Sequence, residues 1–325
     1  MKRTSRCGVR TVALLVLTVG AVMLFVVSPA LYLIVGQLTV GRGSVDCADA
    51  ASPRRRRFST SDEMRYILYG VGGDRFSAYD QQLLDYISRQ ISEPSATRER
   101  RVVTRHTDAS RYGQSALVDR LLSERRDGFF VECGAGDGEI SSNSLFFELE
   151  RNWTGLLVEP NPDFYRTLLD RNRRAYVLRA CLSTERRPAT VRFQPASFSG
   201  GIVGKMHPSH LAFISWRQKS EIDVVCFPLN AVTAALGRTH VDYLSLDVEG
   251  PELEILHTVD WTRLRVDVIA VEYRVHGRVE IDQPATLKKL SELRQFFHDT
   301  GLYREVSVLP PGNESVGLDV VFSRI

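Results

Sequence analysis

Acidic side chains stand at the ends of several apolar runs in this sequence of 325 residues. The runs FFV, GLLV and VIAV each end in a carboxylate, and the run YLSL is followed by two more; the five residues are Glu132, Glu159, Asp247, Glu249 and Glu272. Such apolar runs are typical of buried strands, and a buried carboxylate without a partner is unfavourable. Because the carboxyl ends of parallel strands share one edge of a sheet, where ligands bind, the pattern predicts a polar ligand or a shared hydrogen-bond network.

A glycine-rich turn follows the first of these runs and reads Gly134-Ala135-Gly136-Asp137-Gly138-Glu139. A dinucleotide-binding fingerprint requires a third glycine where Glu139 stands, and a P-loop requires a lysine that this turn lacks. Asp137 and Glu139 would also repel a pyrophosphate. S-adenosylmethionine, a cofactor with a ribose and a positive centre but no phosphate, suits the turn better. The alternative is that the glycines only lead the chain from strand to helix.

The residue types around the turn predict a cofactor-binding role for each position. Gly134 and Gly136 would let the cofactor approach the backbone closely. Glu132 would receive its ammonium group, directly or through water. Glu159 lies 25 residues after Gly134, close to where an acidic residue binds ribose hydroxyls in dinucleotide-binding folds.

Proton transfer is the second chemistry that these residues could support. If the methyl group of the cofactor passes to a hydroxyl, a base assists, and the candidates are Asp247, Glu249, His207, His210 and His276. Two of the histidines lie in the stretch SGGIVGKMHPSH, which is either a mobile lid or an exposed loop with ordinary histidines. Asp247 and Glu249 could instead hold magnesium or calcium, but two carboxylates two positions apart do not suffice to predict a metal site.

The elements that must position these residues alternate along the chain. Strands are expected at 128–136, 154–162, 175–183, 189–196, 222–230, 241–250, 266–273 and 318–324, and helices at 78–91, 114–124, 142–151, 163–172, 251–259 and 286–301. Asp80 is expected to cap the first helix and Gly301 to end the last. The alternation predicts an α/β domain over 78–325, with a mostly parallel twisted sheet and helices on both faces.

Several of these segments resemble the FkbM-type methyltransferase domain. The resemblance covers roughly residues 110–325 and is carried by FFVECGAGDGEISSNSLFFE, WTGLLVEPNP, ACLS and LSLDVEGPELEIL. It implies a Rossmann-like methyltransferase fold in which Glu132, Gly134, Gly136 and Glu159 line the S-adenosylmethionine site. It also implies that Asp247 and Glu249 flank the methyl-transfer cleft.

Within that family the segments are most similar to the membrane-anchored, Star-like proteins of insects. This similarity implies a trafficking function, in which growth-factor precursors are the membrane-bound cargo and move from endoplasmic reticulum to Golgi and endosomes in epidermal growth factor receptor signalling. The alternative is an active S-adenosylmethionine-dependent O-methyltransferase. A luminal location weakens the alternative, because the cofactor is made in the cytosol.

The N-terminal segment predicts a membrane anchor. Residues 11–36 carry no charge and would extend about 39 Å as a helix, against about 30 Å of hydrocarbon. The run is longer than the apolar core of a cleaved signal peptide, which is the alternative. Basic residues in the tail 1–10 favour a cytoplasmic N-terminus. The expected plan is therefore a single-pass protein with a juxtamembrane linker at 37–77 and a luminal domain at 78–325, in endoplasmic reticulum, Golgi or endosomal membranes.

The remaining composition agrees with a luminal globular domain. The formal net charge is +3, so nothing predicts nucleic-acid binding, which requires a basic face. The sequons NWT and NES place glycosylation acceptors at Asn152 and Asn313. Cys133 and Cys181 lie in apolar runs, where free thiols serve as core residues, although one disulfide could form among the luminal cysteines.

Overall fold

The computed structural model describes residues 77–103, 110–215 and 220–325. The predicted tail and anchor, and the linker apart from residue 77, lie outside the described residues. Among the described helices, none combines the length and hydropathy that a membrane span requires.

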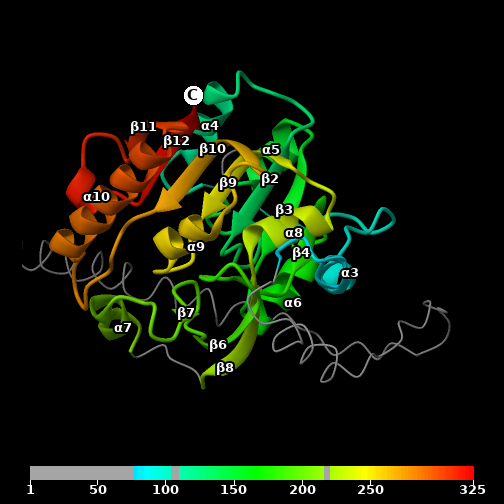
Figure 1. Cartoon of the computed structure of the whole chain (residues 1–325), viewed down its shortest axis with the longest axis horizontal. Helices are drawn as coiled ribbons and strands as arrows, with labels where there is room; N and C mark the ends of the chain where they lie inside the picture. The colour runs from blue at the N-terminus through cyan, green and yellow to red at the C-terminus, as the bar shows by residue number, and fades with distance from the viewer. Residues whose placement is uncertain (1–76, 104–109, 216–219) are drawn as a thin grey trace, which may run out of the picture. The chain divides into compact units, whose positions relative to one another are not determined.

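A central sheet of eight strands organises the described residues (Figure 1). Its order is β1-β4-β3-β2-β9-β10-β12-β11, with bounds Ile91–Ser92, Ala175–Leu178, Thr154–Val158, Phe129–Cys133, His240–Leu246, Arg265–Glu272, Asp319–Arg324 and Tyr303–Leu309. The five strands from β4 to β10 run parallel. The strands β1, β12 and β11 pair antiparallel with their neighbours. The predicted mostly parallel sheet is therefore confirmed for its centre, and its edges make it a mixed sheet.

Helices pack on both faces of the sheet, as predicted. Helices α3, α8, α9 and α10 share one core cluster, and α4, α5 and α6 share the other; their bounds are Gln81–Gln90, Leu229–Ala235, Glu252–Thr258, Gln283–Thr300, Gln114–Leu121, Leu145–Glu150 and Pro162–Arg171. Successive side chains of a strand point to opposite faces. Accordingly, Val131 packs in the first cluster and Phe130 in the second.

A second, four-stranded sheet lies beside the central one (Figure 1). Its order is β5-β8-β6-β7, with bounds Cys181–Leu182, Ile222–Phe227, Ala189–Gln194 and Gly201–Ile202. The prediction of one continuous strand at 175–183 is wrong. The amide of Ala180 donates to the carbonyl of Leu178 at 3.1 Å, a tight turn that sends β4 and β5 into different sheets.

A disulfide between Cys181 and Cys226 joins β5 to β8, where these residues face each other in register. Cys133 is a buried free thiol in β2, as expected of a core residue. The assignment of Cys181 as a core thiol is wrong, because it is half of the disulfide.

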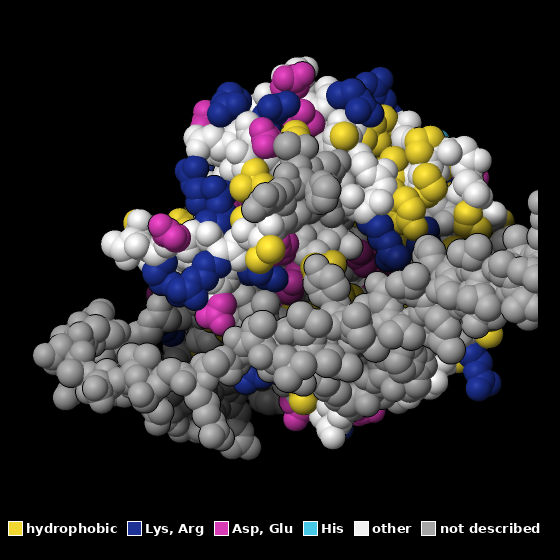
Figure 2. Space-filling view, turned by 180° about the vertical axis from the view of Figure 1, so that it is seen from behind, with side chains coloured by type: hydrophobic (Ala, Val, Ile, Leu, Met, Phe, Trp, Pro, Cys, Tyr) yellow, Lys and Arg dark blue, Asp and Glu magenta, His cyan; other side chains and the backbone are white. Residues whose placement is uncertain are grey.

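Charge is mixed over the described part of the surface drawn in Figure 2, where Lys, Arg, Asp and Glu side chains lie interspersed with small groups of apolar side chains. Six elements were not predicted by the hydrophobic pattern: the strands β1, β7 and β11, the helix α8, which begins within the strand expected at 222–230, the helix α7, Pro208–Ile214, and the 3₁₀ turn η2, Glu314–Val316.

Candidate functional site

One cavity of about 440 Å³ lies at the carboxyl ends of the central parallel strands. Every residue predicted to bind cofactor or to flank the methyl-transfer cleft lines it: Glu132, Gly134, Gly136, Glu159, Asp247 and Glu249. Glu272, at the end of β10, and His276 line it as well. The cavity is within the size range of small-molecule sites. The structure therefore brings the predicted residues together, although their individual roles stay predictions.

The glycine turn holds the ends of β2 and β9 in close contact. Gly134 has φ +81°, and a Cβ on it would lie 1.8 Å from the carbonyl oxygen of Asp247. Gly136 has φ +55°, and a Cβ there would lie 3.0 Å from the ring of Phe198. The Gly134 position therefore requires glycine for the close approach of the two strands, and Gly136 lies beneath an aromatic ring that lines the cavity, at a positive φ that favours glycine.

Glu159 is fixed by backbone donors at the end of β3. One carboxylate oxygen accepts from the Gly136 amide and the other from the Asn161 amide, each at 2.8 Å. Burial raises the pKa of Glu159 to about 7, and the two backbone hydrogen bonds partly offset that rise. Each oxygen keeps a second lone pair, so the carboxylate can still accept hydrogen bonds from a ligand in the cavity.

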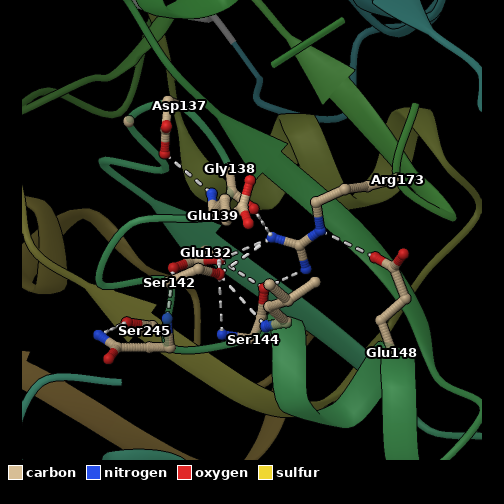
Figure 3. Close-up of polar contacts among 12 residues, drawn as sticks. Glu132, Asp137, Gly138, Glu139, Ser142, Ser144, Glu148, Arg173 and Ser245 are labelled. Carbon is tan, nitrogen blue, oxygen red and sulfur yellow. Dashed lines mark hydrogen bonds and ion pairs between the residues drawn. The ribbon is translucent and has the colours of Figure 1, made fainter. Parts of the chain in front are cut away.

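Glu132 is the centre of a buried hydrogen-bond network (Figure 3). One of its oxygens accepts from the Asn143 amide at 2.7 Å, and the other accepts from the hydroxyls of Ser142, at 2.9 Å, and Ser144. The Arg173 guanidinium lies 3.8 Å from this carboxylate and pairs with Glu148 at 2.9 Å. Glu132 thus holds the segment after the glycine turn in place, a task that the sequence reasoning did not foresee.

Asn143 is a site residue that the sequence reasoning missed. Its side-chain amide donates to Ser245 at 3.0 Å. Its carbonyl oxygen Oδ1 is buried, lacks a hydrogen-bond partner among the described residues, and belongs to a residue that lines the cavity. The only sequence signal for Asn143 was the polar run SSNS after the turn. This run does not indicate which of its side chains point into the cavity.

Asp137 and Glu139 do not have the role that the sequence predicts for them. Arg171 pairs with both carboxylates, at 3.1 Å and 2.8 Å. Asp137 also accepts from the amides of Glu139 and Ile140, and neither acid lines the cavity. The argument that these two residues repel a pyrophosphate is therefore wrong, because both pair with Arg171 and neither lines the cavity.

Three carboxyl groups from two neighbouring strands meet on the other side of the cavity. Asp247 and Glu249 follow β9, and Glu272 ends β10. Burial, together with the charges of Asp319 and Glu252, raises the pKa of Asp247 to about 7. Burial and neighbouring carboxylates also raise the pKa values of Glu249 and Glu272 well above their ordinary range. Glu249 has φ +64°, an uncommon conformation for a residue other than glycine.

The histidines separate into three different environments. His207 is exposed and caps α7, accepting from the Ser209 amide. His210 is buried: its Nε2 lies 2.9 Å from the Ser199 carbonyl oxygen and its Nδ1 lies 3.5 Å from Glu249. Burial lowers the pKa of His210, so the neutral form is favoured. His276 is half-buried and lines the cavity. The alternative of an exposed loop with ordinary histidines is therefore wrong for His210.

The sheet order, with the antiparallel strand β12 inserted between β10 and β11, which run in the direction of the parallel centre, defines a methyltransferase-like α/β protein. The family described as methyltransferase FkbM domain matches residues 132–302, which is 171 of the 325 residues. The chain therefore belongs to the FkbM methyltransferase domain family. Nothing in the comparisons separates a Star-like subgroup from the rest of the family.

Solved structures of methyltransferases match at low identity. The METTL16 methyltransferase domain is 10% identical, with a TM-score of 0.39 over 64% of this chain and 65% of that one, so this chain spans just under two thirds of it. The FkbM methyltransferase from Methylobacillus flagellatus KT is 12% identical, with a TM-score of 0.39 over 74% of this chain and 58% of that one. Precorrin-6y C5,15-methyltransferase from Geobacter metallireducens GS-15 is 15% identical, with a TM-score of 0.34 over 64% of this chain and 86% of that one. At these values the likenesses carry no argument about activity. A comparison with curated proteins gives no match.

Proposed function

We propose that this protein is an S-adenosylmethionine-dependent methyltransferase that acts on a hydroxyl oxygen. The observation that carries the proposal is the single cavity in which Glu159 and the partnerless Oδ1 of Asn143 face the same space as the carboxyl groups after β9. The family supports this, since methyltransferases of this family generally use S-adenosylmethionine.

The residues of the cavity fit this cofactor. Glu159 keeps acceptor capacity for the two hydroxyls of a ribose. Asn143 Oδ1 is a buried acceptor that needs a donor, and an ammonium group provides one. Glu132 lines the same wall, and because its oxygens already accept from three groups, we assign it to positioning Asn143 and supplying negative charge nearby.

When bound, S-adenosylmethionine supplies an electrophilic methyl group on a sulfonium centre. The chain itself must then align an acceptor and remove its proton. Asp247 and Glu249 flank the cleft in this proposal. The pKa of Asp247, about 7, is suited to accepting a proton near neutral pH. His210 contacts Glu249 and is a positioning residue for it.

Isothermal titration calorimetry of the full-length chain tests the cofactor. We expect saturable binding of S-adenosylmethionine and of its demethylated product. Glu159→Gln should weaken binding by about 10- to 100-fold, since hydrogen bonds to a charged group contribute about 1.5–3 kcal/mol. Asn143→Ala should weaken binding as well, because it removes the acceptor for the ammonium group.

The matched control is Glu292→Gln, which changes an exposed carboxylate on α10 outside the cavity and should leave the affinity unchanged. Absence of binding heat for both ligands with the folded wild-type chain would contradict the proposal. Equal affinity of Glu159→Gln and the wild type would contradict the assignment of that residue.

We place the enzyme, as part of the same proposal, on the luminal side of an endoplasmic reticulum, Golgi or endosomal membrane, anchored by residues 11–36; this location requires import of S-adenosylmethionine from the cytosol. Two observations support this location. The Cys181–Cys226 disulfide is typical of an oxidising compartment. Both sequon asparagines, Asn152 and Asn313, are exposed.

The trafficking role with a growth-factor precursor as cargo rests on the Star-like resemblance alone. No observation in the described residues or in the comparisons favours it over methyl transfer, so it stays a hypothesis and is not part of the proposed activity.

A further inference from the structure

Three carboxyl groups that come from two neighbouring strands converge in the cavity. One carboxylate oxygen each from Asp247, Glu249 and Glu272 can be chosen so that all lie within 4.8 Å of one another. We propose that these three residues form a binding site for a hard divalent cation, Mg²⁺, Mn²⁺ or Ca²⁺.

Partnerless oxygens point to a ligand at this place. Glu272 lines the cavity and is only 2% exposed, yet its Oε2 has no hydrogen-bond partner among the described residues. Asp319 stands directly opposite Glu272 in the antiparallel pair of β10 and β12, so their side chains share one face of the sheet. Asp319 is also 2% exposed, and its Oδ1 has no partner in the same part of the chain. A buried oxygen without a partner is unfavourable, and a cation bound among these carboxyl groups would provide one.

The basic groups nearby are committed to other partners. Lys289 pairs with Glu252 at 2.6 Å, and its charge also attracts the carboxylates of Glu272 and Glu249. Arg274 donates to the carbonyls of Val316 and Gly317. His210 lies 3.5 Å from Glu249, and its other ring nitrogen, Nε2, lies 2.9 Å from the Ser199 carbonyl oxygen. Among the described residues, no lysine or arginine forms a salt bridge with Asp247, Glu249 or Glu272.

In a second acidic cluster, arginine side chains balance the charge of the carboxylates. His240, Asp242 and Asp267 also lie within ligand distance of one another. There, Arg125 contacts both aspartates, and Arg265 donates to Asp267 at 2.8 Å. Because arginines already occupy those oxygens, we assign the cation site to the cavity cluster and not to this one.

The ligand set and its exposure determine the type of ion. All three ligand groups are carboxylates, and oxygen ligands favour magnesium, manganese or calcium over zinc or copper. Asp247 and Glu249 line the cavity and are not fully buried, so an ion could enter from the cavity and keep coordination positions open towards it. A hydroxyl bound at such a position would lose its proton more readily. This last role rests on the proposed methyl transfer, whereas ion binding itself does not.

Titration of the chelator-treated full-length chain with Mn²⁺, followed by electron paramagnetic resonance, tests the site without any cofactor. We expect one saturable Mn²⁺ per chain, displaced by Mg²⁺ or Ca²⁺. Glu272→Gln, which conserves shape, should weaken Mn²⁺ binding at least tenfold, and Glu249→Gln should do the same. The control His240→Gln, in the balanced cluster, should bind Mn²⁺ like the wild type.

The design separates this inference from the proposed function. S-adenosylmethionine binding without any saturable Mn²⁺ binding would overturn the cation site alone, and Mn²⁺ binding without cofactor binding would overturn the methyltransferase alone. Unchanged Mn²⁺ affinity in Glu272→Gln, or its loss in His240→Gln, would also overturn the site. If the Glu272 variant does not fold, the stabilisation of the wild-type chain by Mn²⁺ against heat, and its reversal by a chelator, decides. A melting temperature that Mn²⁺ leaves unchanged counts against the site.

Discussion

Gly134 is the residue on which the geometry of the site depends most directly. Alanine at this position would place a Cβ 1.8 Å from the Asp247 carbonyl oxygen, at a φ of +81°. Backbone atoms cannot move aside like a flexible side chain, so Gly134→Ala should destabilise the fold by more than about 4 kcal/mol. Chemical unfolding measures this loss.

Gly113→Ala is the matched comparison. Gly113 has nearly the same φ, +78°, but a Cβ on it would meet nothing within 4 Å. This variant should lose only about 1–2 kcal/mol of stability, which is the cost of the left-handed backbone conformation for alanine. Similar losses in the two variants would show that contact with the β9 end does not matter.

Glu159 should make cofactor affinity depend on pH. Burial raises its pKa to about 7, and only the ionised carboxylate accepts fully from two hydroxyls. Affinity for the demethylated product should therefore rise about tenfold from pH 6 to pH 8, as the ionised fraction increases. Calorimetry at several pH values measures this rise, and Glu159→Gln should show a flat profile. A wild-type affinity that is constant or falls with pH would contradict the assignment.

At the scale of elements, the disulfide between β5 and β8 holds the small sheet against the cavity. Cys181, Phe193 and Ile202 belong to this sheet and line the cavity. The disulfide closes a loop with a sequence separation of 45, so its removal should cost about 2–4 kcal/mol of stability. It should also weaken cofactor binding.

Unfolding of the wild type and of the double variant Cys181→Ala, Cys226→Ala, each with and without reductant, measures this contribution. Reductant should lower the unfolding midpoint of the wild type and leave the double variant unchanged. If reductant lowers the unfolding midpoint of both proteins equally, the loss of stability does not come from the Cys181–Cys226 disulfide, and the prediction is contradicted.

For the molecule as a whole, buried acids at the cavity should make stability fall as pH rises through 7. Burial raises the pKa values of Glu159 and Asp247 to about 7 and that of Asp319 to about 6. Between their ordinary values and these raised values, the folded state holds protons that the unfolded chain has released. The contribution of these groups to stability is therefore fully present below their ordinary pKa values, and it is lost as the pH rises through their raised pKa values.

Urea unfolding should accordingly give a higher free energy of unfolding at pH 6 than at pH 8. His210 has the opposite effect on the free energy of unfolding. Burial lowers its pKa in the folded state, so its protonation below about pH 6.5 favours unfolding. This effect comes from one residue, whereas Glu159, Asp247 and Asp319 all act in the other direction. Stability that increases from pH 6 to pH 8 would contradict the raised pKa values.

Membrane topology is also a property of the whole chain. If the domain is luminal, the full-length chain translated with microsomes should be glycosylated at Asn152 and Asn313, both of which are exposed. The expected result is two glycans that an endoglycosidase removes and that the variants Asn152→Gln and Asn313→Gln each reduce by one. A chain without glycans that protease digests completely outside the microsomes would contradict the luminal location.

The sequence alone determined the α/β class, most of the central strands and helices, and the caps at Asp80 and Gly301. These features depend on local periodicity and on local hydrogen bonds, which can be read from neighbouring residues. It also determined that the carboxylates after the apolar runs share one edge, because parallel strands present their carboxyl ends together. Glu132, Glu159 and Asp247 accordingly line one cavity.

Only the tertiary structure decided which polar atoms have partners. Asp137 and Glu139 pair with Arg171, Glu132 accepts from the serines after the turn, and Asn143 Oδ1 has no partner among the described residues. It likewise joined Glu272 to Asp247 and Glu249 and placed His210 beside that group. These contacts link residues from different elements, and their existence depends on the packing of those elements. No local pattern in the sequence encodes this packing, so the charge balance of the site could not be predicted before the fold was known.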